Sequence, residues 1–136
     1  MEERKKLEER IIAYRVLEAR LNSLVKQRDL LSSKLAEVRS TLESIEEIEK
    51  SEEVLFPLAS GAYTLGKIID KQKIVLSIGA NIALEKSLIE AKKFLNERKD
   101  EIEKALTQIN KEISQISFNL QVLEKEIGKI VGEKGV

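Results

Sequence analysis

The chain has neither cysteine nor histidine among its 136 residues. Without cysteine it can form no disulfide framework and no thiolate zinc site. Its many serines and carboxylates have no histidine beside them to act as a base, and they fall on the solvated faces of expected helices. Paired carboxylates such as Glu46-Glu47 are therefore interpreted as solvating charge. We expect no enzyme activity, no catalytic residue, no metal site and no cofactor.

An excess of charge of either sign is also lacking, since 24 basic residues balance 24 acidic ones. Without a basic excess to neutralise phosphates, nucleic acid is not an expected partner. No apolar run approaches the ~18 residues that span a bilayer, so no membrane contact is expected. The charged first residues predict that there is no signal peptide. These observations together favour a cytoplasmic protein.

Aromatic residues are scarce, at 4% of the chain, whereas charged residues reach 35%. This leaves little material for a globular core and is typical of long helices with a narrow apolar seam. The length predicts a single domain over residues 1–136. We expect such a chain to bury its seam against itself and its remaining apolar surface against other chains.

Two long runs place apolar residues at heptad spacing, which predicts coiled-coil helices. The run within residues 1–50 has ten apolar residues at twelve seam positions, and the run within 87–131 has eleven at thirteen. We expect an antiparallel pair with Ile45 near Leu88 and Leu7 near Ile127. Ser87 followed by Glu90 predicts the second N-terminus through a capping box, and 132–136 would form a tail. The seam positions are Leu7, Arg10, Tyr14, Leu17, Leu21, Leu24, Arg28, Leu31, Leu35, Val38, Leu42 and Ile45, then Leu88, Lys92, Leu95, Lys99, Ile102, Leu106, Ile109, Ile113, Ile116, Leu120, Leu123, Ile127 and Ile130.

Four of these seam residues, Arg10, Arg28, Lys92 and Lys99, are basic. The favoured interpretation is that their long apolar stems pass the partner helix while the charged ends reach water. The alternative is that they fix the register of the pair or loosen it locally.

Residues 51–86 differ from both runs, because they hold the single proline, Pro57, among short β-rich segments. We expect strands at 54–58, 62–69, 73–78 and 82–84, with Gly, Ser and Asn supplying the turns. Two isolated hairpins are marginally stable and expose unpaired edges, so these strands should pair with other subunits. The predicted oligomerisation residues are Val54, Phe56, Leu58, Tyr63, Leu65, Ile74, Leu76, Ile78 and Ile82.

Gly61 to Lys67 matches the phosphate-binding pattern G-x-x-x-x-G-K. That pattern requires Ser or Thr next, a strand before it and a helix after it. Here Ile68 follows, within a β-rich run. We therefore interpret the segment as a hairpin turn with its return strand, and not as a nucleotide site.

Off-seam apolar residues gather near the chain termini, where the first expected helix begins and the second one ends. Val16 and Val122 fall on one side of the expected pair, and Ile12 lies level with Val122, so they form a candidate lateral patch. Fraying of the helix ends would expose seam residues beside it. The candidate binding tip comprises Leu7, Ile11, Ile12, Tyr14, Val16, Phe118, Val122, Ile127, Ile130 and Val131.

The middle third carries a family resemblance in residue detail. Val54 to Leu58, Gly61 to Tyr63, Lys67-Ile68, Lys73 to Leu76, Ile78-Gly79 and Glu85 to Ala91 resemble the alpha class of archaeal prefoldins. The helices agree with that family only in architecture. Ala59 and Asn81 depart from it, because they stand where the family often has glycine.

The resemblance implies an archaeal hexamer of two alpha-type and four beta-type subunits. Its fold class would be α+β and mostly α, a long antiparallel two-helix coiled coil with two β-hairpins that join an intersubunit β-barrel. Its members hold unfolded client proteins at the coil tips without ATP and pass them to a group II chaperonin. A structural coiled-coil adaptor or a filament-forming prefoldin-like subunit is the alternative. An arm that binds tRNA is a third, which the zero net charge disfavours.

Overall fold

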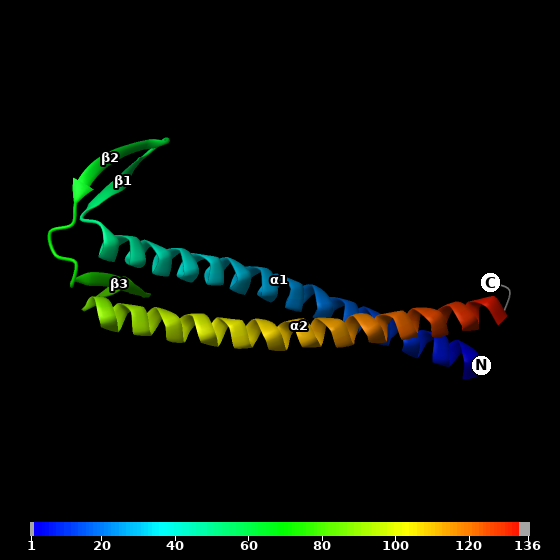
Figure 1. The fold of residues 1–136 in the computed structure, drawn as a ribbon. Coiled ribbons are helices and arrows are strands. Elements are labelled where there is room, and N and C mark those ends of the chain that lie inside the picture. Colours follow the sequence, from blue (N-terminus) through cyan, green and yellow to red (C-terminus); the bar gives the residue numbers. More distant parts are fainter. Residues whose placement is uncertain (1, 134–136) are drawn as a thin grey trace. The chain divides into compact units, whose positions relative to one another are not determined.

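The structure, a computed structural model, describes residues 2–133 of the chain. Two long helices, α1 (Glu2–Lys50) and α2 (Leu88–Glu133), precede and follow four short strands in the sequence (Figure 1). The strands are β1 (Glu53–Ala59), β2 (Ala62–Lys67), β3 (Ile74–Gly79) and β4 (Ile82–Lys86). This order confirms the predicted fold class, α+β and mostly helical.

The chain divides into two compact units. The hairpin unit, Lys34–Ile102, holds the end of α1, all four strands and the start of α2. The tip unit combines Met1–Ser33 with Glu103–Val136 and so contains the start of α1 and the rest of α2. In each unit a segment of α1 lies beside a segment of α2.

Heptad spacing places the apolar stripe of each helix against the other helix, and every predicted seam position is buried or half-buried. Leu24 and Leu120 are buried in the tip unit, and Ile45 and Leu95 in the hairpin unit. Ion pairs cross between the helices from Arg10 to Glu126 and from Arg20 to Glu112. From the first ion pair to the second, the residue number rises along α1 and falls along α2. The helices are therefore antiparallel, as predicted.

α2 begins after Ser87, as its sequence predicts. The backbone N–H of Glu90 donates to Ser87 Oγ at 3.2 Å, which satisfies one of the free donors of the first turn. The N–H of Ala91 donates to the Ser87 carbonyl at 2.9 Å and starts the helical ladder. The helix continues to Glu133, two residues past the expected end at 131. Residues 134–136 of the expected tail lie outside the described residues.

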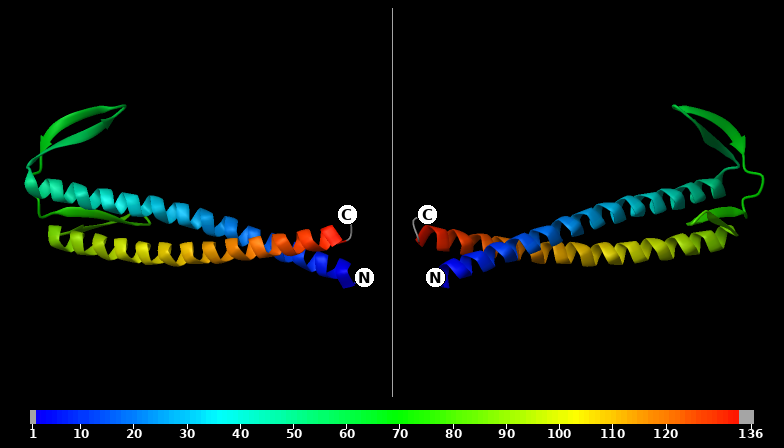
Figure 2. Two further views of the ribbon diagram at one scale, coloured as in Figure 1. Left: turned by 45° about the vertical axis from the view of Figure 1, so that its right-hand side comes forward. Right: turned by 180° about the vertical axis from the view of Figure 1, so that it is seen from behind.

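The four strands form two separate antiparallel hairpins, β1–β2 and β3–β4. Glu53 pairs with Lys67 in the first, and Ile74 pairs with Lys86 in the second. The return strand β2 ends at Lys67 and not at 69, opposite Glu53, the first residue of β1. The N–H of Ile68 still donates to the Glu52 carbonyl at 2.9 Å, just beyond the strands. Within the hairpin unit, β1–β2 stands away from the helices, whereas β3–β4 lies along them (Figure 2).

Both hairpin turns require positive φ angles. Ser60 and Gly61 have φ of 51° and 78°, and Ala80 and Asn81 have φ of 50° and 60°. Two consecutive residues with positive φ are typical of the type I′ turn, whose twist matches that of paired strands. The residue before each turn, Ala59 or Gly79, also has positive φ, and the strand register shifts there.

Candidate functional site

Four large apolar residues of the predicted binding tip project into solvent from the tip unit. The exposed fraction of the side chain is 62% for Ile12, 63% for Val16, 64% for Phe118 and 40% for Val122. We call these four residues the tip patch. The other six residues of the predicted binding tip are half-buried, and they are Leu7, Ile11, Tyr14, Ile127, Ile130 and Val131.

Heptad geometry explains why the tip patch is exposed. Val16 and Val122 occupy equivalent positions, one step outside the residues that flank the seam, and Ile12 and Phe118 point away from it. A shallow hollow beside Phe118 is lined by Ser114, Gln115 and Asn119, which carry no charge. This surface can therefore contact an apolar segment and also offer hydrogen bonds to its backbone.

The first hairpin has two apolar faces. Leu55 and Leu65 are paired across the strands, and with Tyr63 they form one face on which each residue is at least 62% exposed. Val54, Phe56 and Leu58 alternate onto the other face. The ring of Phe56 covers Gly66, where an added Cβ would lie 2.5 Å from Phe56 Cε2. A two-stranded sheet is only marginally stable by itself in water, and these apolar groups remain a candidate interface with other chains.

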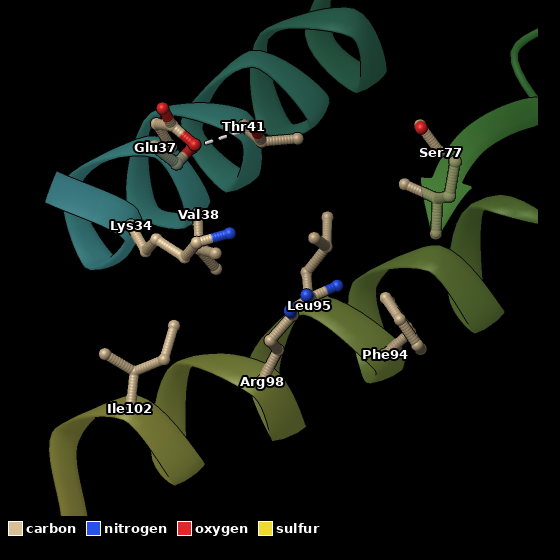
Figure 3. A pocket seen from close by; sticks show the side chains of 10 residues that line it. Lys34, Glu37, Val38, Thr41, Ser77, Phe94, Leu95, Arg98 and Ile102 are labelled. Carbon is tan, nitrogen blue, oxygen red and sulfur yellow. Dashed lines mark hydrogen bonds between the residues drawn. The ribbon is translucent and has the colours of Figure 1, made fainter. Parts of the chain in front are cut away.

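The second hairpin is already covered on one face by its own chain. Leu76 is buried and lines a hollow with Val38, Leu95 and Ile102, drawn in Figure 3 between α1, α2 and the end of β3. Lys86 and Arg98 approach the Phe94 ring at 5.8 Å and 5.9 Å from its centroid. Leu76 is thus not free for another subunit. Among the other predicted residues of this hairpin, Ile74 is half-buried, and Ile78 and Ile82 are exposed.

Several exposed apolar residues were absent from the prediction. Leu55, Val75 and Leu84 are exposed on the hairpins, and Ile69 and Ile89 lie exposed beside them. Alternation along the strands could have found Leu55, because it pairs directly with the predicted Leu65. Leu30, 64% exposed in the tip unit, also lies outside the predicted binding tip.

The segment from Gly61 to Lys67 is a turn followed by a strand. Gly61 lies in the turn, and Gly66 and Lys67 belong to β2, where Lys67 is paired with Glu53. A phosphate-binding loop needs its backbone N–H groups to converge at a helix N-terminus. The hairpin interpretation of this sequence is therefore confirmed.

Three of the four basic seam residues reach a carboxylate. Arg10 pairs with Glu126, Arg28 with its neighbour Asp29, and Lys92 with Glu49. Lys99 is half-buried. Arg28 pairs within its own helix, whereas Arg10 and Lys92 each bridge α1 and α2.

Between residues 2 and 133, the structure holds no cluster of metal-ligating side chains. Over the same described range, neither helix has an apolar stretch long enough to cross a membrane.

Comparisons with known proteins match nearly the whole chain. The family model described as Prefoldin, prefoldin subunit, covers residues 3–133. A prefoldin subunit alpha from Pyrococcus horikoshii is 34% identical over 130 residues, or 93% of this chain and 83% of that protein. One from Thermofilum pendens is 36% identical and covers 76% of this chain and 85% of its own.

A solved structure has a similar fold. The filamentous PFD from Methanocaldococcus jannaschii, determined by cryo-electron microscopy, has a TM-score of 0.65 to this chain at 23% identity. The alignment covers 84% of this chain and 97% of that one.

Proposed function

Because the chain belongs to the prefoldin family, we propose that it is an ATP-independent chaperone subunit whose tip holds unfolded client proteins. The observation that carries this proposal is the tip patch, four apolar side chains exposed at the paired ends of two helices. An unfolded client exposes apolar segments of its own. Contact removes both apolar surfaces from water. This burial contributes a favourable free energy of about 25 cal/mol per Å² of apolar area.

Each tip offers only a small apolar area, so a single contact is weak. Affinity arises when several tips of one assembly bind the same client, because the later contacts are intramolecular. The hairpins supply that assembly by pairing with beta-type subunits, two chains of this kind with four of the partner. Clients held in this way pass to a group II chaperonin in the cytoplasm, with no nucleotide consumed by this subunit.

The test changes the tip patch alone. Replacing Ile12, Val16, Phe118 and Val122 with Ser should weaken client holding by roughly tenfold or more, because the apolar contact area is lost. The measurement is light scattering of an aggregating unfolded client at matched concentrations of assembled complex. Leu30→Ser is the matched control, since Leu30 is as exposed as Phe118 but is not in the tip patch. Full protection by the fourfold variant would place client binding in the hairpin unit.

A second candidate function is a filament-forming or adaptor subunit. It is favoured by the exposed apolar residues of the first hairpin and by the similar fold of a filamentous protein. In that case the tip patch would contact other subunits and not clients. The oligomeric state with a beta-type partner separates the two candidates.

A further inference from the structure

The seam of the tip unit carries a cation close to its end. Arg10 occupies a seam position between Leu7 and Tyr14, where the heptad pattern otherwise places apolar side chains. On the facing helix, Ile127 and Ile130 hold the last seam positions. The end of the pair therefore lacks one apolar layer, and its closure depends on what Arg10 contacts.

Arg10 reaches across to the other helix. Its Nε donates a hydrogen bond to Glu126 Oε2 at 2.6 Å, so the ion pair bridges α1 and α2. Glu126 directly precedes the seam residue Ile127, which places its carboxylate at the margin of the seam. The two side chains are 40% and 44% exposed, so dissolved ions can reach the pair.

An exposed ion pair contributes little to the stability of a whole fold. The end of a helix pair is different, because the free energy of local opening there approaches zero. Loss of an exposed ion pair there should raise the ratio of open to closed helix ends by about two- to fivefold. Salt screens exposed charges, so a rise in ionic strength should have the same effect.

We infer that the Arg10–Glu126 ion pair is a latch that sets how often the tip opens. Opening uncovers the half-buried residues Leu7, Tyr14, Ile127 and Ile130 beside the tip patch and so enlarges the apolar surface. As a regulator of client capture, the latch rests on the proposed function. As a conformational device, it stands on the geometry of the ion pair alone.

The test measures opening directly in the 136-residue chain. The chain contains no cysteine, so spin labels can be placed at Lys6→Cys and Lys129→Cys, one on each exposed flank of the tip. Electron paramagnetic resonance then gives the distribution of distances between the labels. Glu126→Gln should raise the open population about two- to fivefold. Arg10→Leu, which restores an apolar seam residue, should lower it.

Two controls separate the latch from a general effect of charge. Glu112→Gln breaks the next ion pair along the helices, Arg20–Glu112 at 3.3 Å, and should leave the tip distances unchanged. The double variant Arg10→Glu with Glu126→Arg should restore the wild-type distribution, because it rebuilds the pair with reversed polarity. Raising salt from about 50 mM to about 500 mM should open the wild-type tip but not the Arg10→Leu tip.

The outcomes for the latch and for the proposed function are distinguishable. A shift in label distances supports the latch whether or not client holding changes with it. Identical distance distributions in Glu126→Gln and wild type, at both salt concentrations, would overturn the latch and leave the holding function standing.

Discussion

At the scale of single residues, the clearest local conflict is at Ala59. Its φ is 111°, in the region where the Cβ of an L-residue is crowded. Gly79 occupies the corresponding place in the second hairpin, with φ of 98°. The two hairpins thus make the same turn, one with the glycine that it favours and one without. Strain of this kind costs about 1–3 kcal/mol.

Ala59→Gly should therefore raise the free energy of unfolding by about 1 kcal/mol, because the strain relieved exceeds the added chain entropy. The reciprocal change, Gly79→Ala, should lower it by a similar amount. Thermal unfolding followed by circular dichroism at one fixed protein concentration measures both changes.

Ala62→Gly serves as the control, since Ala62 lies in a strand and is not among the residues with positive φ. It should destabilise the protein by about 0.5–1 kcal/mol through chain entropy alone. A lower melting temperature for Ala59→Gly than for wild type would contradict the strain argument.

At the scale of secondary-structure elements, the helices were the most predictable part of the chain. Heptad spacing placed every seam residue correctly. A period sustained over many turns allows only one orientation of each helix that turns its whole apolar stripe toward the partner helix. Ser87 marked the start of α2 because a hydroxyl can cap free N–H groups. The end of β2 could not be predicted from the sequence, since Ile68 and Ile69 continue the apolar run although the strand ends at Lys67, opposite the first residue of β1.

The candidate surfaces were predicted less completely, and the reason is again physical. Alternation identifies which side chains share a strand face, but not what covers that face. Leu65 and Leu76 looked equivalent for this reason. In the structure Leu65 is 65% exposed, whereas Leu76 is 9% exposed and packs within its own chain.

That difference predicts separate effects for the same substitution in the two hairpins. Leu65→Asp should abolish assembly with beta-type subunits while helicity and local stability stay near wild type, because the charge meets an apolar partner surface. Leu76→Asp should lower the melting temperature of the chain even without a partner, since it buries a carboxylate among Val38, Leu95 and Ile102. Size-exclusion chromatography and circular dichroism report the two effects.

Glu85→Asp, at an exposed strand position, is the matched control and should change neither property. Normal assembly of the Leu65→Asp variant would mean that the first hairpin is not an interface between subunits.

At the scale of the whole molecule, the proposed role depends on association. The first hairpin exposes Leu55, Tyr63 and Leu65 on one face and Leu58 on the other, and each hairpin is a two-stranded sheet with unpaired outer edges. A closed barrel of strands from several chains removes such edges, whereas an open stack always leaves one at each end. A defined hexamer and a filament are thus two ways to pair the edges of the same strands. They differ in how the mass of the assembly depends on protein concentration.

Sedimentation of the 136-residue chain with its beta-type partner decides between them. We expect one species that contains two copies of this 15.4 kDa chain and four of the partner, with a mass that stays constant on dilution. Closure explains the constancy, because a complete barrel has no free edge to recruit another subunit. Leu65→Asp added to the same mixture should remain outside the complex. Polymers that lengthen with concentration would instead favour the filament-forming subunit, and the tip patch would then be assigned to contacts between subunits.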